Sequence, residues 1–103
     1  MRVSLIFLLP LLLAAQGAGG ITGKIIDING AGLPGVNVMV KGTYYGAASD
    51  LEGHYRIDKI NPGSYDVEVS MIGYKVILKT GVKIEPKEIL TLDFTLEETV
   101  LSF

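Results

Sequence analysis

Three residues with side chains suited to chemistry lie close together in the middle of the chain: Asp50, Glu52 and His54. Carboxylates can bind a cation, but a calcium loop of the common kind needs more oxygen ligands and a glycine later in the loop. His54 is the only histidine and cysteine is absent, so one copy cannot supply the three or four ligands of a zinc site. We therefore predict a structural turn here, with a cation site on Asp50 and Glu52 as the alternative.

The same stretch has the residue types of a tight hairpin. Asp50 can accept hydrogen bonds from backbone N–H groups two residues further on, as in a type I turn. Gly53 supplies the left-handed conformation that returns the chain as a strand, and Tyr55 is the first large side chain of that strand. The pattern predicts a hairpin over residues 50–55, with His54 as a solvated turn residue.

Other candidate chemistry does not form a recognisable site. Ser49 and Ser70 do not lie in the strained, glycine-flanked turn of a hydrolase nucleophile. The glycines of residues 30–35 are not followed by a helix whose N-terminus could bind a phosphate. Glu97 and Glu98 are adjacent, so on a strand they point to opposite faces. We predict no catalytic, cofactor-binding or metal-binding residue, and hence no enzyme.

Three tyrosines, Tyr55, Tyr65 and Tyr74, each follow a glycine closely. An aromatic platform for a sugar or peptide is one interpretation. We favour the other, in which tyrosines fill the ends of a β-sandwich and their hydroxyls bond to turn backbone. The predicted structural turn residues are then Asp50, Gly53, Tyr55, Gly63, Tyr65, Gly73 and Tyr74.

Tyr44 and Tyr45 form a different pattern. Adjacent residues of a strand point in opposite directions, so one of these two rings must lie outside the fold. If the chain has a contact surface, this pair is the better candidate for it.

The N-terminal residues are typical of a secretory signal peptide. Arg2 precedes an apolar run over residues 3–15, and residues 15–17 offer small side chains for cleavage. The run is shorter than the roughly 20 residues that a membrane-spanning helix needs. We predict a signal peptide over residues 1–17, with an uncleaved anchor as the alternative, and no membrane span in the mature chain.

Composition narrows the remaining possibilities. The chain has 103 residues, which predicts one domain. Residues 18–103 hold 8 Lys and Arg against 11 Asp and Glu, a side-chain charge of −3 without a basic cluster, so nucleic acid binding is not expected. Without cysteine there are no disulfides, and stability must come from apolar burial.

The rest of the chain is patterned as short strands. Six glycines from Gly32 to Gly81 recur every 8 to 11 residues, and the segments between them alternate apolar and polar side chains. No window has a capped helical period. We predict an all-β, seven-stranded antiparallel Greek-key sandwich, with a first strand over residues 21–28 and a short, edge-lying strand within residues 42–49.

In four predicted strands the apolar residues alternate clearly enough to predict which side chains face the core. The residues expected to line up along one face of each strand are Val36, Val38 and Val40; Tyr55, Ile57 and Ile60; Tyr65, Val67, Val69 and Met71; and Leu90, Leu92, Phe94 and Leu96. Between the last two, Val76 and Leu78 alternate with Lys75, Ile77 and Lys79.

Several segments together resemble the carboxypeptidase regulatory-like domain, over about residues 20–97. They are residues 23–27 (GKIID), 33–38 (LPGVNV), 41–43 (KGT), 49–50 (SD), 53–55 (GHY), 63–65 (GSY) and 69–74 (VSMIGY). Ser49 stands where the family more often has threonine. The resemblance implies a transthyretin-like (prealbumin-like) sandwich over residues 18–97 that carries no peptidase residues.

A signal peptide followed directly by this domain is similar to the start of TonB-dependent outer-membrane receptors, including the SusC-like ones. The resemblance implies a non-catalytic periplasmic domain, associated with the outer membrane and involved in nutrient uptake. Its implied partners are the receptor's plug and barrel in the same longer chain, or an associated surface lipoprotein. The alternatives are a free-standing secreted module that binds a glycan or protein and, as the weakest, an accessory domain of a metallocarboxypeptidase.

The apolar alternation stops at Leu96, where two acids follow. Continuing the strand would place a carboxylate on the inner face, and burying an unpaired charge is costly. We therefore predict that the sandwich ends near Leu96 or Glu97 and that residues 98–103 form a linker towards a downstream domain.

Overall fold

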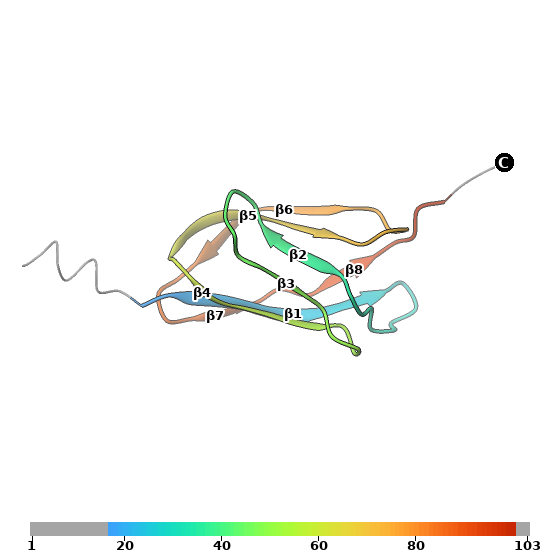
Figure 1. Cartoon of the computed structure of the whole chain (residues 1–103), viewed down its shortest axis with the longest axis horizontal. Coiled ribbons are helices and arrows are strands. Elements are labelled where there is room, and N and C mark those ends of the chain that lie inside the picture. The colour runs from blue at the N-terminus through green and yellow to red at the C-terminus, as the bar shows by residue number, and fades with distance from the viewer. Residues whose placement is uncertain (1–16, 101–103) are drawn as a thin grey trace, which may run out of the picture.

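In the computed structural model, which describes residues 17–100, the chain folds into two β-sheets packed face to face (Figure 1). The predicted signal peptide lies almost entirely outside the described residues, as does the end of the predicted linker. Within residues 17–100 no helix is long and apolar enough to cross a bilayer. The strands are β1 (Gly19–Asp27), β2 (Asn37–Val40), β3 (Gly46–Ala48), β4 (His54–Ile60), β5 (Gly63–Ser70), β6 (Ile77–Ile84), β7 (Ile89–Thr91) and β8 (Phe94–Leu96).

The first sheet is built around β1. This strand pairs with β4 on one side and with β7 and then β8 on the other. β7 and β8 are two parts of the predicted C-terminal strand, so the eight segments correspond to the seven predicted strands. They are separated at Leu92 and Asp93, where the Asp93 carboxylate accepts a hydrogen bond from the Lys24 backbone N–H at 2.9 Å.

One pairing differs from the predicted antiparallel sandwich. β7 and β8 run parallel to β1, whereas β4 is antiparallel to it. The chain reaches β7 by crossing from the second sheet, so no hairpin connects β7 to the strand beside it. The alternation of side chains is the same in either direction, and for that reason it could not reveal the parallel pairing.

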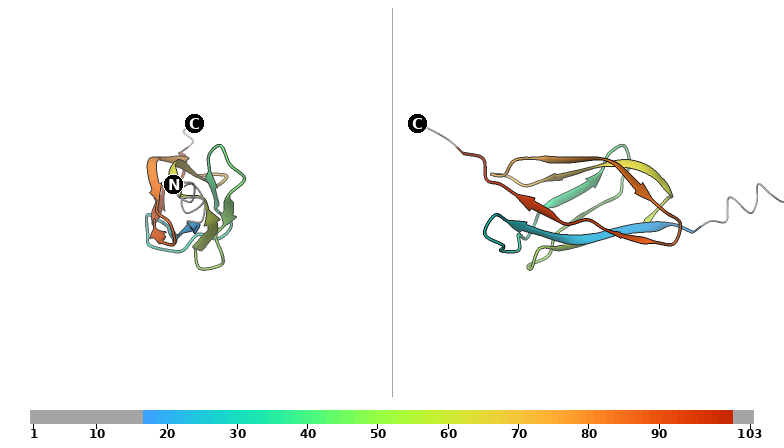
Figure 2. Two further views of the ribbon diagram at one scale, coloured as in Figure 1. Left: turned by 90° about the vertical axis from the view of Figure 1, so that its left-hand side faces the viewer. Right: turned by 180° about the vertical axis from the view of Figure 1, so that it is seen from behind.

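The second sheet has the order β3-β2-β5-β6, and all its pairs are antiparallel. β3 lies at its edge, which confirms the prediction for residues 42–49. The first and last described residues lie at opposite ends of the sandwich (Figure 2).

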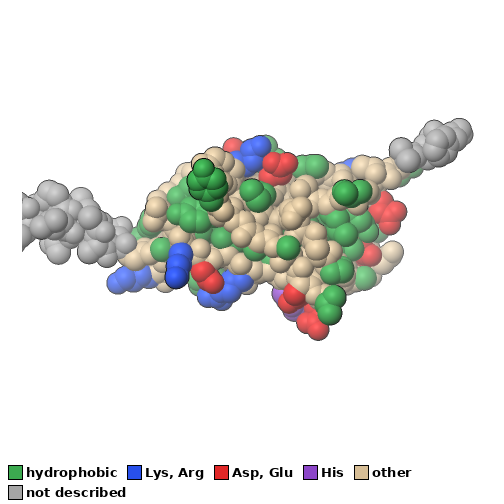
Figure 3. Space-filling model, viewed as in Figure 1, with side chains coloured by type: hydrophobic (Ala, Val, Ile, Leu, Met, Phe, Trp, Pro, Cys, Tyr) green, Lys and Arg blue, Asp and Glu red, His purple; other side chains and the backbone are tan. Residues whose placement is uncertain are grey.

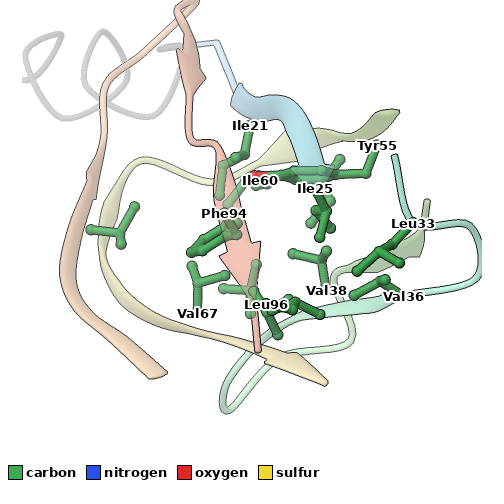
Figure 4. Close-up of a cluster of buried hydrophobic side chains, with 14 of the residues drawn as sticks. Ile21, Ile25, Leu33, Val36, Val38, Tyr55, Ile60, Val67, Phe94 and Leu96 are labelled. Atoms are coloured by element: carbon green, nitrogen blue, oxygen red, sulfur yellow. The ribbon is translucent and has the colours of Figure 1, made fainter. Parts of the chain in front are cut away.

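The core lies between the sheets, where the predicted inward residues gather (Figure 4). Alternation along β2, β4, β5 and β8 brings one face of each strand to this space. The buried apolar side chains are Ile21, Ile25, Leu33, Val36, Val38, Val40, Tyr55, Ile57, Ile60, Val67, Val69, Val82, Ile84, Phe94 and Leu96. Tyr65, Met71, Leu90 and Leu92 are partly buried against them.

The edge strand β4 contains a β-bulge. Two of its residues, Asp58 and Lys59, lie opposite the single residue Gly20 of β1. Lys59 has a φ of 61°, in the left-handed region that non-glycine residues seldom adopt. The bulge brings Ile57 and Ile60, three residues apart, to the same buried face.

A second bulge changes the inner face of β6. Thr80 and Gly81 lie opposite the single residue Asp66, and Gly81 has a φ of 67°. Before the bulge Ile77 packs against the core, while after it Val82 and Ile84 are buried. The strand thus continues through Gly81, and the exposed apolar residues before the bulge are Leu78 in β6 and Val76 just ahead of it. Regular alternation could not show this, because the extra residue shifts the inward positions by one.

The C-terminal segment also differs from the prediction, because pairing continues past Glu97. The Lys75 N–H donates to the Glu97 carbonyl at 2.8 Å, and the Thr99 N–H donates to the Gly73 carbonyl at 2.9 Å. Between them Tyr74 and Glu98 form an antiparallel bridge. Glu98 is exposed, so the expected cost of burying its charge does not arise there.

The inner face of β6 can be tested with two alanine substitutions. Ile84→Ala removes a side chain that is only 2% exposed and should lower the free energy of unfolding by about 2–5 kcal/mol. Leu78→Ala, the control on the same strand at 52% exposure, should change it by about 0.5 kcal/mol or less. Urea unfolding of the two variants measures both values. A larger loss for Leu78→Ala would mean that β6 presents its other face to the core.

Candidate functional site

The predicted hairpin over residues 50–55 is a tight turn that connects β3 of one sheet to β4 of the other, so these two strands are not paired with each other. The Asp50 carboxylate closes this turn. Its Oδ1 accepts hydrogen bonds from the backbone N–H groups of Glu52 and His54, each at 2.9 Å. The Asp50 N–H donates to the His54 carbonyl at 2.8 Å, and the Gly53 N–H donates to the Asp50 carbonyl at 2.9 Å. The N–H groups of His54 and Glu52 hold the pKa of the Asp50 carboxyl below its usual value of 3.8. The carboxylate has the hydrogen bonds of a turn cap.

Gly53 places this turn directly against β1. Its φ is 89°, and its carbonyl accepts a hydrogen bond from the Ile25 N–H at 2.8 Å. A Cβ at this position would overlap the Ile25 carbonyl oxygen and lie 3.0 Å from the Leu33 nitrogen. Glycine is therefore required here for its backbone conformation and for the close approach.

The three candidate ligands of the turn do come together at the surface. Ligand atoms of Asp50, Glu52 and His54 lie within 4.8 Å of one another, and all three residues are exposed. The sequence suggested the two acids, and the structure adds His54, whose Nδ1 is 4.0 Å from Glu52 Oε1. Because Asp50 Oδ1 is already bonded to two N–H groups, few oxygens remain for calcium, which takes 6–8 of them. The arrangement suits a turn better than a cation site.

Ser49 joins the loop after β1 to the end of β3. It is 6% exposed, the one buried polar residue within residues 17–100. Its Oγ donates to the Leu33 carbonyl at 2.6 Å and accepts from the Val36 N–H at 2.9 Å. These bonds satisfy backbone groups that would otherwise be buried without partners. Nothing in the sequence around Ser49 signalled this role, which depends on a loop more than ten residues away.

Two of the three tyrosines bond to backbone through their hydroxyls. Tyr55 donates to the Leu92 carbonyl at 2.6 Å, and Tyr65 donates to the Asn61 carbonyl at 2.7 Å. Burial, and then the charge of Asp93, raise the pKa of Tyr55 well above its usual value. Tyr74 is half-buried beyond the end of β5, whereas Tyr65 lies near its start. The three rings do not meet in one platform.

The neighbours Tyr44 and Tyr45 are divided between solvent and core. The ring of Tyr44 is fully exposed, at 104% of its reference area, whereas Tyr45 packs against the core. The turn that presents Tyr44 is fixed by Thr43, whose Oγ1 donates to the Val40 carbonyl at 2.7 Å and accepts from the Tyr45 N–H at 2.9 Å. This places Tyr44 on a rigid support, which suits a residue that makes contacts with a partner.

A hollow at the C-terminal end of the sandwich was not evident from the sequence. Its volume is about 460 Å³, and its lining combines apolar side chains such as Ile28, Tyr74 and Val100 with acids. Hydrophobic and acidic side chains are visible at this end, beside the departing chain (Figure 3). The lining comes from three segments that are distant in sequence, so no local motif could predict it.

Comparison with known families assigns the chain to a domain family. The family model of the carboxypeptidase regulatory-like domain matches residues 20–97. This chain belongs to the carboxypeptidase regulatory-like domain family. The match confirms the resemblance drawn from the sequence motifs.

Two curated relatives of this regulatory-like domain are much longer proteins. The TonB-dependent receptor P39 of Formosa agariphila is 40% identical over 55 residues, which are 53% of this chain and 5% of the receptor. Carboxypeptidase D of Anas platyrhynchos is 29% identical over 84 residues, which are 81% of this chain and 6% of that protein. The chain thus spans about one-twentieth of the length of either relative.

Solved structures similar to this domain show the fold. A chain of a type II cohesin–X-dockerin complex from Acetivibrio cellulolyticus has a TM-score of 0.69 at 18% identity, covering 78% of this chain and 58% of that one. The minor pilin GBS52 of Streptococcus agalactiae has a TM-score of 0.58 at 17% identity, covering 85% and 48%. These likenesses support the β-sandwich and carry no information about ligands.

The close packing at Gly53 predicts a difference between two glycines of this regulatory-like domain. Gly30 and Gly53 both have a φ of 89°, but nothing lies within 4 Å of a Cβ built on Gly30. Gly30→Ala should cost about 1–2 kcal/mol, for the backbone conformation alone. Gly53→Ala should cost roughly 1–3 kcal/mol more, because the backbone of β1 must also move. Equal losses in chemical denaturation would contradict the packing role of Gly53.

The Asp50 turn predicts a pH dependence of stability. The pKa of Asp50 is lower in the folded state than its usual 3.8, so its contribution is present above that value and is lost as the pH falls through the lowered pKa. Asp50→Ala should therefore lower the melting temperature at neutral pH, and the gap to the wild type should close in acid. Calcium or EDTA should leave the wild-type melting temperature unchanged. A rise with calcium that Asp50→Ala abolishes would assign a cation site instead.

Proposed function

We propose that this chain is the non-catalytic accessory domain of a TonB-dependent outer-membrane receptor involved in nutrient uptake. The observation that carries the proposal is the 40% identity with the TonB-dependent receptor P39, within the family match over residues 20–97. The domain accounts for only a small part of that receptor. Its partners are then the plug and barrel of the same longer chain, or an associated surface lipoprotein.

The N-terminal sequence supports a proposed location. Residues 1–17 have the composition of a secretory signal, which would direct the domain across the inner membrane. A domain that precedes the plug and barrel of an outer-membrane receptor lies in the periplasm. We propose this compartment and an arrangement of signal peptide (residues 1–17), regulatory-like sandwich (18–97) and a connecting segment (98–103) whose first residues still pair with the sandwich.

A non-catalytic role is supported by how the polar side chains are used. The Asp50 carboxylate, the Ser49 hydroxyl and the Tyr55 hydroxyl are each hydrogen-bonded to backbone groups of the fold. A nucleophile or general base needs a free atom and a partner that activates it. These groups act as structural links between the turn, the loops and the sheets.

A second candidate function is favoured by Tyr44. Its fully exposed ring stands on a turn held by the Thr43 hydroxyl. Aromatic rings presented in this way are frequent at sites that bind sugars and proteins. A free-standing secreted module could use this ring to bind a glycan or a protein.

Size and location of the mature protein distinguish the two candidates. An antibody against this domain should detect, in the outer-membrane fraction of the native organism, a chain many times heavier than 11.0 kDa. Extraction with detergent but not with high salt would establish that the chain is membrane-embedded through its other parts. A free species of roughly the domain's own size in the medium would contradict the receptor proposal and favour the secreted module.

A further inference from the structure

A second hollow adjoins the first at the end where the chain leaves the sandwich. Its volume is about 390 Å³, and it shares Ile28, Lys75 and Glu97 with the hollow of about 460 Å³. We call the combined area around these residues, with Tyr74, Val76 and Val100, the exit surface. Its centre is the ion pair between Lys75 Nζ and Glu97 Oε1, at 3.1 Å.

Apolar side chains of the exit surface are unusually open to solvent. Ile28 is 69% exposed, Val76 59% and Val100 82%, and Ile72 on the adjacent turn is fully exposed. Single exposed apolar residues are common, but a group of them beside two hollows marks a surface that another body covers. Burying these side chains on docking would remove apolar area from water.

The exit surface is also held in shape by backbone hydrogen bonds. The Asp27 carboxylate accepts from the N–H groups of Asn29 at 2.8 Å and Ala31 at 3.0 Å, which fixes the loop that carries Ile28. The Gly73 carbonyl accepts from the Thr99 N–H at 2.9 Å and from the Thr99 hydroxyl at 3.2 Å. A surface that is already ordered loses little entropy when a partner binds.

The charged side chains around the hollows are mostly acidic. Asp27, Glu97 and Glu98 line them together with a single base, Lys75, which is paired with Glu97. The charged side chains that line the two hollows therefore have a net charge of −2. A segment that inserts apolar side chains here fits best if Lys or Arg flank it.

We propose that the exit surface docks the domain that follows in the same receptor chain, through an apolar segment flanked by basic residues. This inference rests on the proposed function. The surface lies where the chain leaves the sandwich, so a following domain is tethered beside it at high effective concentration. Pairing of the departing chain with Gly73, Tyr74 and Lys75 fixes the direction in which that domain is presented.

Hydrogen exchange of the domain inside the intact receptor, compared with the 103-residue chain alone, tests the docking. Peptides over residues 71–77 and 97–100 should exchange about tenfold more slowly in the receptor, as expected when docking closes this surface. Val76→Glu and Glu98→Lys should behave differently. The first should abolish the added protection by placing a charge among the apolar groups, and the second should weaken it by reversing one of the acidic charges that line the hollows.

Leu51→Glu, which adds a charge at a position that is 86% exposed and lies outside the exit surface, is the control and should leave the protection unchanged. Thermal melting of each isolated variant checks that the sandwich remains folded. Equal exchange of these peptides in the two chains, with the receptor assembled, would overturn the docking while leaving the proposed function in place. A reading frame without a receptor would overturn both.

Self-association gives a further outcome. Sedimentation of the 103-residue chain should show a monomer. A dimer that Val76→Glu dissociates and Leu51→Glu does not would show that a second copy covers the exit surface, and the proposal would be wrong.

Discussion

The fold depends on one strand, β1, whose buried side chains pack between the two sheets, because a chain without cysteine has no disulfide to hold the sheets together. Its side chains Ile21 and Ile25 are fully buried in the space between the sheets, and its backbone pairs with β4, β7 and β8. Ile25 also forms backbone hydrogen bonds with Gly53 in the turn between β3 and β4 and with Leu33 in the loop after β1. A sandwich of this size has a thin margin of stability, so these contacts must form together or not at all.

Sequence patterns were most informative where a strand has one buried face and a regular ladder. Val36, Val38 and Val40, and likewise Val67 and Val69, lie inside as their alternation predicts. The pattern was misleading at β6, where the bulge at Gly81 shifts the inner face to Val82 and Ile84. It also carried no information on the parallel pairing of β7 and β8 with β1, or on the pairing of Thr99 with Gly73, since these depend on the path of the chain.

The candidate sites were predictable to a smaller extent. The carboxylate cap and the positive φ of Gly53 follow from local rules, which the turn obeys. Ser49 was considered only as a nucleophile, because its partners Leu33 and Val36 come near it only in the folded chain. The exit surface has the same origin, since Ile28, Tyr74 and Val100 are brought together by tertiary structure. Local sequence rules therefore predicted the turns, whereas the exit surface forms only when the chain folds.

The bulge in β4 has a consequence for how the domain behaves at high concentration. Edge strands invite pairing with other chains, the first step of aggregation. The extra residue and the positive φ of Lys59 interrupt the regular ladder of this edge, and the Arg56–Asp58 ion pair at 2.7 Å adds charge to it. β6, at an edge of the other sheet, is interrupted by its own bulge, and the remaining edge strands β3, β7 and β8 offer only three residues each. The sandwich can therefore be crowded among its own copies without fusing edge to edge, which leaves its side-chain surfaces as the places where specific contacts form.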